Sequence, residues 1–315
     1  MSKDKFKEEL RLFKSLFKCR EDVFAIRWEK GSKSGYMPAY YFDPYMFRAH
    51  KISGGTFQNF TDKRYLALND IEIEKHLNGE QLIGIYPLFE NNTSCFIAAD
   101  FDKDNWFEES KIFVSACIEK GVPAYLERSR SGKGGHVWIF FEQPYPAVRS
   151  RKIFTSILEQ SGVFSIFDKS SSFDRLFPNQ DFHSGKGLGN LIALPLFKKT
   201  LEKGNSCFIN VDDACPYSDQ WKYLKSIRKI SPEELDKLYQ IVSDAFIENN
   251  HFNKSKNADT KKLTISLDNQ IRITRYNLSI TLINFLKEEL NFVNTEFLIK
   301  KKTGRNTFGT ERYFK

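Results

Sequence analysis

The spacing of apolar residues predicts alternating helices and strands through most of the chain. Residues 4–20 place an apolar side chain at every third or fourth position, which predicts an amphipathic helix. Residues 22–28 alternate between two faces, as a β-strand does. Further along, the same criteria predict helices and strands in this order: helix 71–80, strands 82–89 and 95–102, helix 106–121, strands 123–129 and 136–142, and helix 147–162. This alternation indicates an α/β (α+β) fold.

Two stretches depart from the regular pattern. Residues 31–64 are rich in glycine, aromatic and basic residues without a clear period, so we expect an irregular, partly exposed excursion there. After residue 220 the sequence favours helices, and Ser231 as N-cap with Pro232 at the first position predicts one at 231–250. The segments expected after it are a polar linker, a second helix and a basic tail, at 251–262, 277–290 and 300–315.

Composition is that of a soluble intracellular protein. Of the 315 residues, 41% are apolar and 28% charged, which is ordinary for a globular chain. We find no run of eighteen or more apolar residues and no signal-peptide pattern at the N-terminus, so we expect a cytoplasmic protein without a membrane partner. No C-x-x-C pair occurs, so neither a disulfide framework nor a zinc knuckle is indicated by the five cysteines, Cys19, Cys95, Cys117, Cys207 and Cys215.

The charge balance favours a polyanionic partner, but only weakly. Lys plus Arg exceed Asp plus Glu by 48 to 40, giving a net charge of +8 and a pI near 9.0. Such a surplus permits binding to nucleic acid, although many basic proteins bind no polyanion.

Asp100 and Asp102 end the predicted strand at 95–102. Residues two apart on a strand share one face and lie about 6.6 Å apart. Both carboxylates could therefore converge on two divalent ions about 3.5–4 Å apart, the arrangement used for displacement at phosphorus. The alternative is a pair of solvated acids at an exposed strand end. The opposite face is apolar and is expected to lie in the core, with Ile97, Ala99 and Phe101.

A basic, glycine-rich turn at 128–135 leads into the strand that His136 begins. Its glycines let the backbone approach an anion, and Arg130, Ser131 and Lys133 supply donors and positive charge, so the turn could hold a triphosphate. It is no Walker A loop, because a strand and not a helix follows. A lone histidine is ordinarily a structural, hydrogen-bonded residue; beside this turn, contact with a phosphate is an equal alternative.

A third carboxylate would complete the charge needed to hold two metal ions beside a triphosphate. Three aspartates after residue 165 are candidates, and each could instead be a loop acid paired with a cation such as Arg175. The pattern of the segment does not choose among Asp168, Asp174 and Asp181.

Together these motifs resemble those of the archaeo-eukaryotic primase superfamily. Its first motif, apolar residues followed by Asp-x-Asp or Glu, matches IAADFD at 97–102; its second, a small residue, any residue and a histidine on a strand, matches 134–136. Its third, an apolar residue followed by an acid, matches 173–174. Within the superfamily the chain is most similar to primase-polymerases of prokaryotic conflict systems, TOTE-type and CRISPR-associated. That similarity extends over 76–89, 126–141, 173–181, 187–196 and 291–314.

The resemblance implies roles for particular residues. Asp100, Asp102 and Asp174 would be catalytic and would bind two divalent ions, Mg²⁺ or Mn²⁺. The resemblance also implies that His136, Ser131 and Lys133, with Gly134 of the same motif, contact the phosphates of the nucleotide. We add Arg130 to these nucleotide-binding residues. The implied activity is DNA-templated nucleotidyl transfer from an NTP or dNTP to a 3′-hydroxyl, with de novo primer synthesis. The implied partners are a DNA template, the nucleotide, and fused or associated helicase, nuclease or CRISPR adaptation proteins.

The resemblance also suggests how the chain is organised. Residues 1–90 would form the N-terminal part of the catalytic unit, and residues 91–228 its core, with two sheets forming a cleft. Residues 229–315 would form a mainly helical C-terminal region with a basic tail.

One feature of similar proteins is missing. Many carry zinc-binding cysteines across the region of residues 31–64, but no cysteine occurs between Cys19 and Cys95, so no zinc is expected. Aromatic residues could replace the metal with an apolar mini-core, which is the role we expect, or could stack on template bases. They include Tyr36, Tyr40, Tyr41 and Phe47.

Two other functions compete with the primase-polymerase. A metal-dependent nuclease could use the same acids, but it has no need of a cationic glycine turn for a triphosphate. A non-catalytic nucleic-acid-binding module with a decayed site is the third hypothesis, and the presence of the acids together with His136 counts against it.

Overall fold

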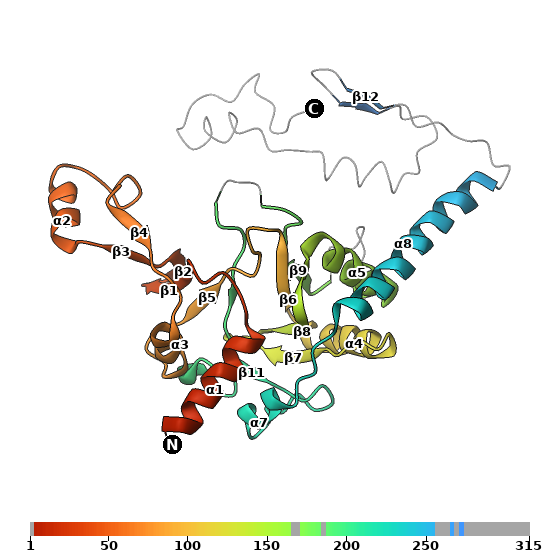
Figure 1. Ribbon diagram of the computed structural model, residues 1–315, viewed down its shortest axis with the longest axis horizontal. Coiled ribbons are helices and arrows are strands. Elements are labelled where there is room, and N and C mark those ends of the chain that lie inside the picture. The colour runs from red at the N-terminus through yellow and green to blue at the C-terminus, as the bar shows by residue number, and fades with distance from the viewer. Residues whose placement is uncertain (1–2, 165–170, 184–186, 256–264, 268–270, 274–315) are drawn as a thin grey trace. The chain divides into compact units, whose positions relative to one another are not determined.

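The computed structural model describes the chain apart from residues 1–2, 165–170, 184–186, 256–264, 268–270 and 274–315. The chain forms two compact units, Met1–Phe246 and Ile247–Lys315. The helices of the first unit are α1 (Lys3–Leu16), α2 (Pro44–Ile52), α3 (Asp70–Leu77), α4 (Trp106–Glu119), α5 (Ala147–Gln160), α6 (Lys198–Leu201), α7 (Gln220–Lys225) and the first part of α8 (Pro232–Ser255) (Figure 1). Its strands are β1 (Ala25–Lys30), β2 (Lys33–Pro38), β3 (Tyr40–Phe42), β4 (Lys63–Tyr65), β5 (Ile83–Ile85), β6 (Thr93–Asp102), β7 (Tyr125–Arg128), β8 (Gly134–Pro146), β9 (Phe173–Phe177), β10 (Ile192–Ala193) and β11 (Cys207–Phe208).

A five-stranded antiparallel sheet in the order β11-β7-β8-β6-β9 forms the middle of the first unit. Strand β6 is buried on both faces because its apolar residues alternate between two clusters. On one face Ile97, Ala99 and Phe101 pack with residues of α4 and α5, as predicted, and each is 0% exposed. On the other face Phe96 and Ala98 enter a second cluster. The strand is therefore held from both sides up to the point where its acids begin.

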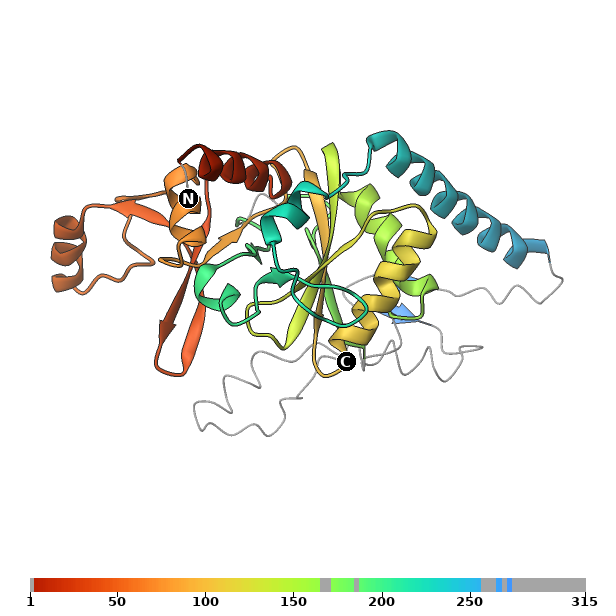
Figure 2. The ribbon, with the colours of Figure 1, turned by 90° about the horizontal axis from the view of Figure 1, so that it is seen from below.

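The second cluster joins this sheet to a four-stranded antiparallel sheet in the order β10-β5-β1-β2. Ile83 and Ile85 of β5 meet Trp138 and Phe140 of β8 there, and Phe17 from the end of α1 packs edge-on against both aromatic rings of β8. Figures 1 and 2 both show the four-stranded sheet and the helices α4 and α5 on opposite sides of the five-stranded sheet. The fold is thus mixed α/β with several antiparallel sheets.

Residues 31–64 are partly exposed, as expected, but the expectation that they are irregular was wrong. The segment contains β2, which pairs with β1 from Ala25↔Pro38 to Lys30↔Lys33, and the β3–β4 hairpin with α2 between its strands. These strands show no clear alternation because they are short or exposed, and few of their side chains reach a core. These strands form because they pair with other segments of the chain, and the local sequence pattern carries no information about that pairing.

Helix α8 begins as predicted, with a capping box. Glu234 N donates to Ser231 Oγ at 3.2 Å, and Ser231 N donates to the Glu234 carboxylate at 2.8 Å. The helix continues to Ser255, so the first part of the expected linker at 251–262 is helical. In the second unit, β12 (Ile265–Leu267) and β13 (Ile271–Ile273) pair as two antiparallel strands, between the expected linker and the expected helix, where we predicted no element.

The predicted helix at 277–290 and the basic tail at 300–315 lie outside the described residues. Among the helices that are described, none combines the length and apolar character needed to cross a bilayer.

Candidate active site

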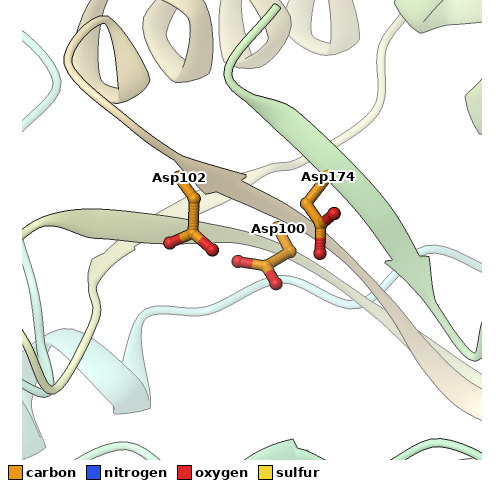
Figure 3. A group of neighbouring side chains, drawn as sticks. All are labelled: Asp100, Asp102 and Asp174. Carbon is orange, nitrogen blue, oxygen red and sulfur yellow. The ribbon is translucent and has the colours of Figure 1, made fainter. Parts of the chain in front are cut away.

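Three aspartates meet at the end of β6. Asp100 and Asp102 come from β6 itself, and Asp174 comes from the neighbouring strand β9 (Figure 3). One carboxylate oxygen from each lies within 4.8 Å of one from each of the others. Asp100 is partly buried, whereas Asp102 and Asp174 are exposed. The predicted face-sharing of Asp100 and Asp102 thus places both beside a third acid.

A β-bulge explains how Asp174 reaches this position. Strands β6 and β9 pair as Asp100↔Arg175 and then as Phe101↔Phe173, so Asp174 is an extra residue without a partner in the ladder. Bulges re-aim a side chain out of the regular alternation. Here the bulge turns Asp174 toward the β6 carboxylates, and its neighbour Phe173 packs against Phe101 with ring centroids 5.8 Å apart.

The other candidates for the third acid have different positions. Asp181 accepts a hydrogen bond from Arg151 Nε at 2.7 Å and is not among the clustered carboxylates. Asp168 lies outside the described residues. Asp174 does pair with Arg175, whose Nε lies 2.5 Å from its carboxylate, yet it also takes part in the cluster, so the two readings of this acid are compatible.

Without a cation, the clustered carboxylates repel one another. Burial raises the pKa of Asp100 to about 6; His136 opposes that rise, and the charges of Asp102 and Asp174 add to it. The three side chains offer only hard carboxylate oxygens, the ligand type that suits Mg²⁺ or Mn²⁺. A bound divalent ion would relieve the repulsion among them. The residues therefore fit a divalent metal site.

His136 lies directly across the sheet from Asp100, in the register Asp100↔His136. Its Nε2 is 3.6 Å from Asp100 Oδ1, and its Nδ1 is 2.8 Å from Glu127 Oε2. Burial alone would lower the pKa of His136, but Glu127 and the aspartates raise it to about 9. The imidazole is thus held as a cation, with Nδ1–H donated to Glu127 and Nε2–H on the side of the acids.

Glu127 is a residue of the site that our sequence analysis missed. It is 2% exposed, lies on β7 opposite His136, and accepts hydrogen bonds from His136 Nδ1 at 2.8 Å and from Trp138 Nε1 at 2.7 Å. A buried carboxylate needs such partners. The sequence did contain a sign of it: Glu127 lies inside the predicted strand 123–129, and the next predicted strand begins with His136.

The glycines of the basic turn make room for the site. A Cβ on Gly134 would lie 2.5 Å from Asp102 Oδ1, and one on Gly135 would lie 2.5 Å from the Trp106 ring. Real Cβ atoms do not come so close. The sequence suggested that these glycines give an anion access; in the structure Gly134 leaves space for the Asp102 carboxylate and Gly135 for the Trp106 ring.

The turn ends at Gly134, which pairs with Asp102 across the sheet, and Lys133 directly precedes it. Ser131 and Lys133 are exposed, and Ser131 Oγ accepts a hydrogen bond from Lys133 N at 3.2 Å. Arg130 lies 3.9 Å from Glu29 of β1. Arg128, also in the turn, has a structural role, since it donates to two backbone carbonyls, those of Gly204 and Ala214.

A hollow of about 290 Å³ opens beside β9. Arg175 and Phe177 of β9 line it together with Tyr86, which follows β5. It places open space beside the partner of Asp174. The residues that complete its lining are Gly189, Asn190 and Leu191.

Comparison with known proteins bears on the identity of this site. The polymerase domain of Mycobacterium tuberculosis Ligase D, solved in complex with DNA, is similar at a TM-score of 0.37 and 13% sequence identity, over 75% of this chain and 85% of that one. No curated protein matches the sequence. The sequence profile of the Archaeo-Eukaryotic Primase domain of TOTE conflict systems matches residues 8–238, well over half of the chain. This match confirms the resemblance found in the motifs, and the chain belongs to the archaeo-eukaryotic primase domain family of TOTE conflict systems.

Proposed function

We propose that this protein is a DNA-templated primase-polymerase that transfers a nucleotide from an NTP or dNTP to a 3′-hydroxyl and also makes primers de novo. Membership of the primase family supports the reaction class. The observation that carries the proposal is the convergence of Asp100, Asp102 and Asp174, with a carboxylate oxygen of each within 4.8 Å of the others. DNA and a nucleoside triphosphate are the proposed partners, within a conflict system that also supplies helicase or nuclease activities.

Each group of the site has a proposed part in the transfer. The three carboxylates would hold two divalent ions, Mg²⁺ or Mn²⁺, which supply Lewis-acid stabilisation to the triphosphate and to the attacking hydroxyl. His136 would donate its Nε2–H to a phosphate oxygen, because Glu127 occupies its Nδ1. Lys133, Arg130 and Ser131 would bind the phosphate tail and stabilise the charge that develops on departing pyrophosphate.

The distribution of charge in the site supports separate roles for the acids, which would bind metal ions, and for the cations, which would bind phosphates. The acid cluster and the cationic turn are adjacent but separate, since Asp102 pairs with Gly134 while Lys133 is the next residue along. A triphosphate bound between them would meet its metal ions on one side and fixed positive charge on the other. A nuclease has no need of the second feature.

Replacement of Asp100 tests the proposal. Asp100→Ala should abolish incorporation of nucleotides on a labelled primer-template with Mg²⁺ or Mn²⁺, because it removes the carboxylate at the centre of the cluster. DNA binding measured by fluorescence anisotropy should survive. Lengthened products from the unaltered protein support the polymerase, and shortened products would support the nuclease instead. Residual synthesis by the variant would refute the assignment of Asp100.

A further inference from the structure

The β3–β4 hairpin separates aromatic side chains into an inner and an outer face. Its register is Tyr40↔Tyr65, Tyr41↔Arg64 and Phe42↔Lys63. Tyr40 and Phe42 contact Phe57 on the inner face, with ring centroids 5.3 and 5.4 Å apart. Tyr41 is on the other face and is 60% exposed. The guanidinium of Arg64 lies 4.8 Å from the centroid of its ring.

The inner face holds this module, residues 40–65, together without help from Tyr41. The rings of Phe42, Phe47, Phe57 and Phe60 contact one another edge-on. The ammonium of Lys63 donates to three backbone carbonyls of the loop before β4, those of Phe57, Gln58 and Phe60, at 2.5, 3.1 and 2.7 Å. An aromatic mini-core and one cation thus order this module. Tyr41 lies outside this mini-core, and packing within the module does not account for its exposed position.

The rest of the module is also apolar and basic at its surface. Helix α2 has no buried residue, and Tyr45 and Ile52 are 77% and 80% exposed. Arg48 and Lys51 of the same helix are exposed as well. The two acids within residues 40–65 are Asp43 and Asp62, and Asp43 serves as the N-cap of α2, accepting from Tyr45 N at 2.8 Å. The charge of this surface is therefore complementary to a polyanion.

We infer that residues 40–65 form a docking surface for single-stranded nucleic acid, in which a base stacks on Tyr41 beside Arg64 and neighbouring cations contact phosphates. Exposed aromatic rings interleaved with cations are the combination that binds single strands, because every base has a π-face. A duplex has no free face to offer. The inference rests on the proposed function, since the strand would be the template. Figures 1 and 2 both show the module projecting from the end of the first unit that carries the four-stranded sheet.

The test is fluorescence anisotropy with a 5′-labelled single-stranded oligonucleotide and with a blunt-ended duplex of two fully complementary strands of that length, in EDTA and without nucleotide, so that catalysis plays no part. Tyr41→Ala and Tyr41→Leu should weaken single-strand binding by about 5- to 150-fold, the range for one lost stacking contact. Tyr41→Phe keeps the ring and should bind as the unaltered protein does. Duplex binding should not change. Ile118→Ala on α4, where the side chain is 59% exposed, is the matched control for loss of exposed apolar surface.

The outcomes are separable. Tight single-strand binding by Tyr41→Ala or Tyr41→Leu would overturn the inference, as expected if the surface docks a protein instead. Equal weakening by Tyr41→Phe or by Ile118→Ala would overturn it too, because stacking at Tyr41 would not be the cause. If the unaltered protein binds no single strand at all, this surface has no such ligand; nucleotide incorporation by the same preparation would still support the proposed function.

Discussion

At the scale of single residues, Glu127 sets the orientation and the charge of the His136 ring. Its buried carboxylate accepts from the imidazole and from the Trp138 indole, so it sets both the direction in which the ring faces and its charge. The pKa of His136 lies at about 9 against an ordinary value of 6.5, which keeps the ring charged at neutral pH. Acting through His136, Glu127 is a positioning residue.

Glu127→Gln should therefore lower the pKa of His136, because it removes the negative charge but retains an acceptor. As the pH rises, His136 would then lose its proton at a lower pH than in the unaltered protein. We expect the KM for the nucleotide at pH 8 to rise about tenfold, the order of a lost charge-assisted hydrogen bond. The checks are the pH profile of this KM and an NMR titration of His136 in the metal-free protein. Trp138→Phe, which keeps the charge, should leave both unshifted; superimposable profiles for Glu127→Gln and the unaltered protein would contradict the assignment.

At the scale of elements, the pairing of β6 with β8 ties the shape of the basic turn to the acid cluster. Gly134 faces Asp102 across this pair, and any side chain there would displace the carboxylate. The glycine thus belongs to the metal-binding arrangement, although it offers no ligand atom.

Gly134→Ala should weaken Mn²⁺ binding while the fold persists, because its new Cβ would lie 2.5 Å from both Asp102 Oδ1 and the Phe101 carbonyl. Isothermal titration with Mn²⁺ and thermal unfolding measure the two effects. The control is Gly162→Ala, which has open space but a φ of +74°, and should cost about 1 kcal/mol of stability without changing Mn²⁺ affinity. Unchanged Mn²⁺ binding by Gly134→Ala would show that Asp102 tolerates displacement.

The same elements mark what could be predicted from sequence. Alternation along 95–102 and 136–142 correctly predicted strands, and along 95–102 it also predicted a core face with Ile97, Ala99 and Phe101, because those side chains meet a buried environment. Asp174 could be matched only through the family motif, since a bulge breaks the local period at that residue. The hairpin of residues 40–65 was missed because its strands are three residues long and half exposed.

At the scale of the whole molecule, the order of strands was beyond local patterns. β9 lies beside β6 although about 70 residues separate them in the chain, and β10 joins the other sheet. Sequence alternation records that a residue is buried but not which segment buries it. For that reason the local pattern left Asp168, Asp174 and Asp181 open and only the family motif selected Asp174, whereas the α/β character followed from the local pattern.

His76 links the stability of the first unit to pH. The side chain is 0% exposed, donates Nε2–H to the Pro195 carbonyl at 2.8 Å and accepts from Ile83 N at Nδ1. It thereby joins α3, β5 and the segment after β10. Both ring nitrogens are satisfied only in the neutral form, since a proton on Nδ1 would face the Ile83 N–H. Burial lowers its pKa from 6.5 to about 4.

Acid should therefore destabilise the protein through this residue. Between pH 6.5 and 4 the unfolded chain binds a proton that the native state does not, so stability is full above the unfolded pKa and falls as pH decreases, until the native ring also protonates near pH 4. The expected loss from pH 7 to pH 5 is about 2 kcal/mol. Urea unfolding followed by tryptophan fluorescence at both pH values measures it. His76→Gln, which does not titrate, should be less stable at pH 7 yet lose about 2 kcal/mol less on acidification. Equal losses in the two proteins would mean that other groups cause the acid sensitivity.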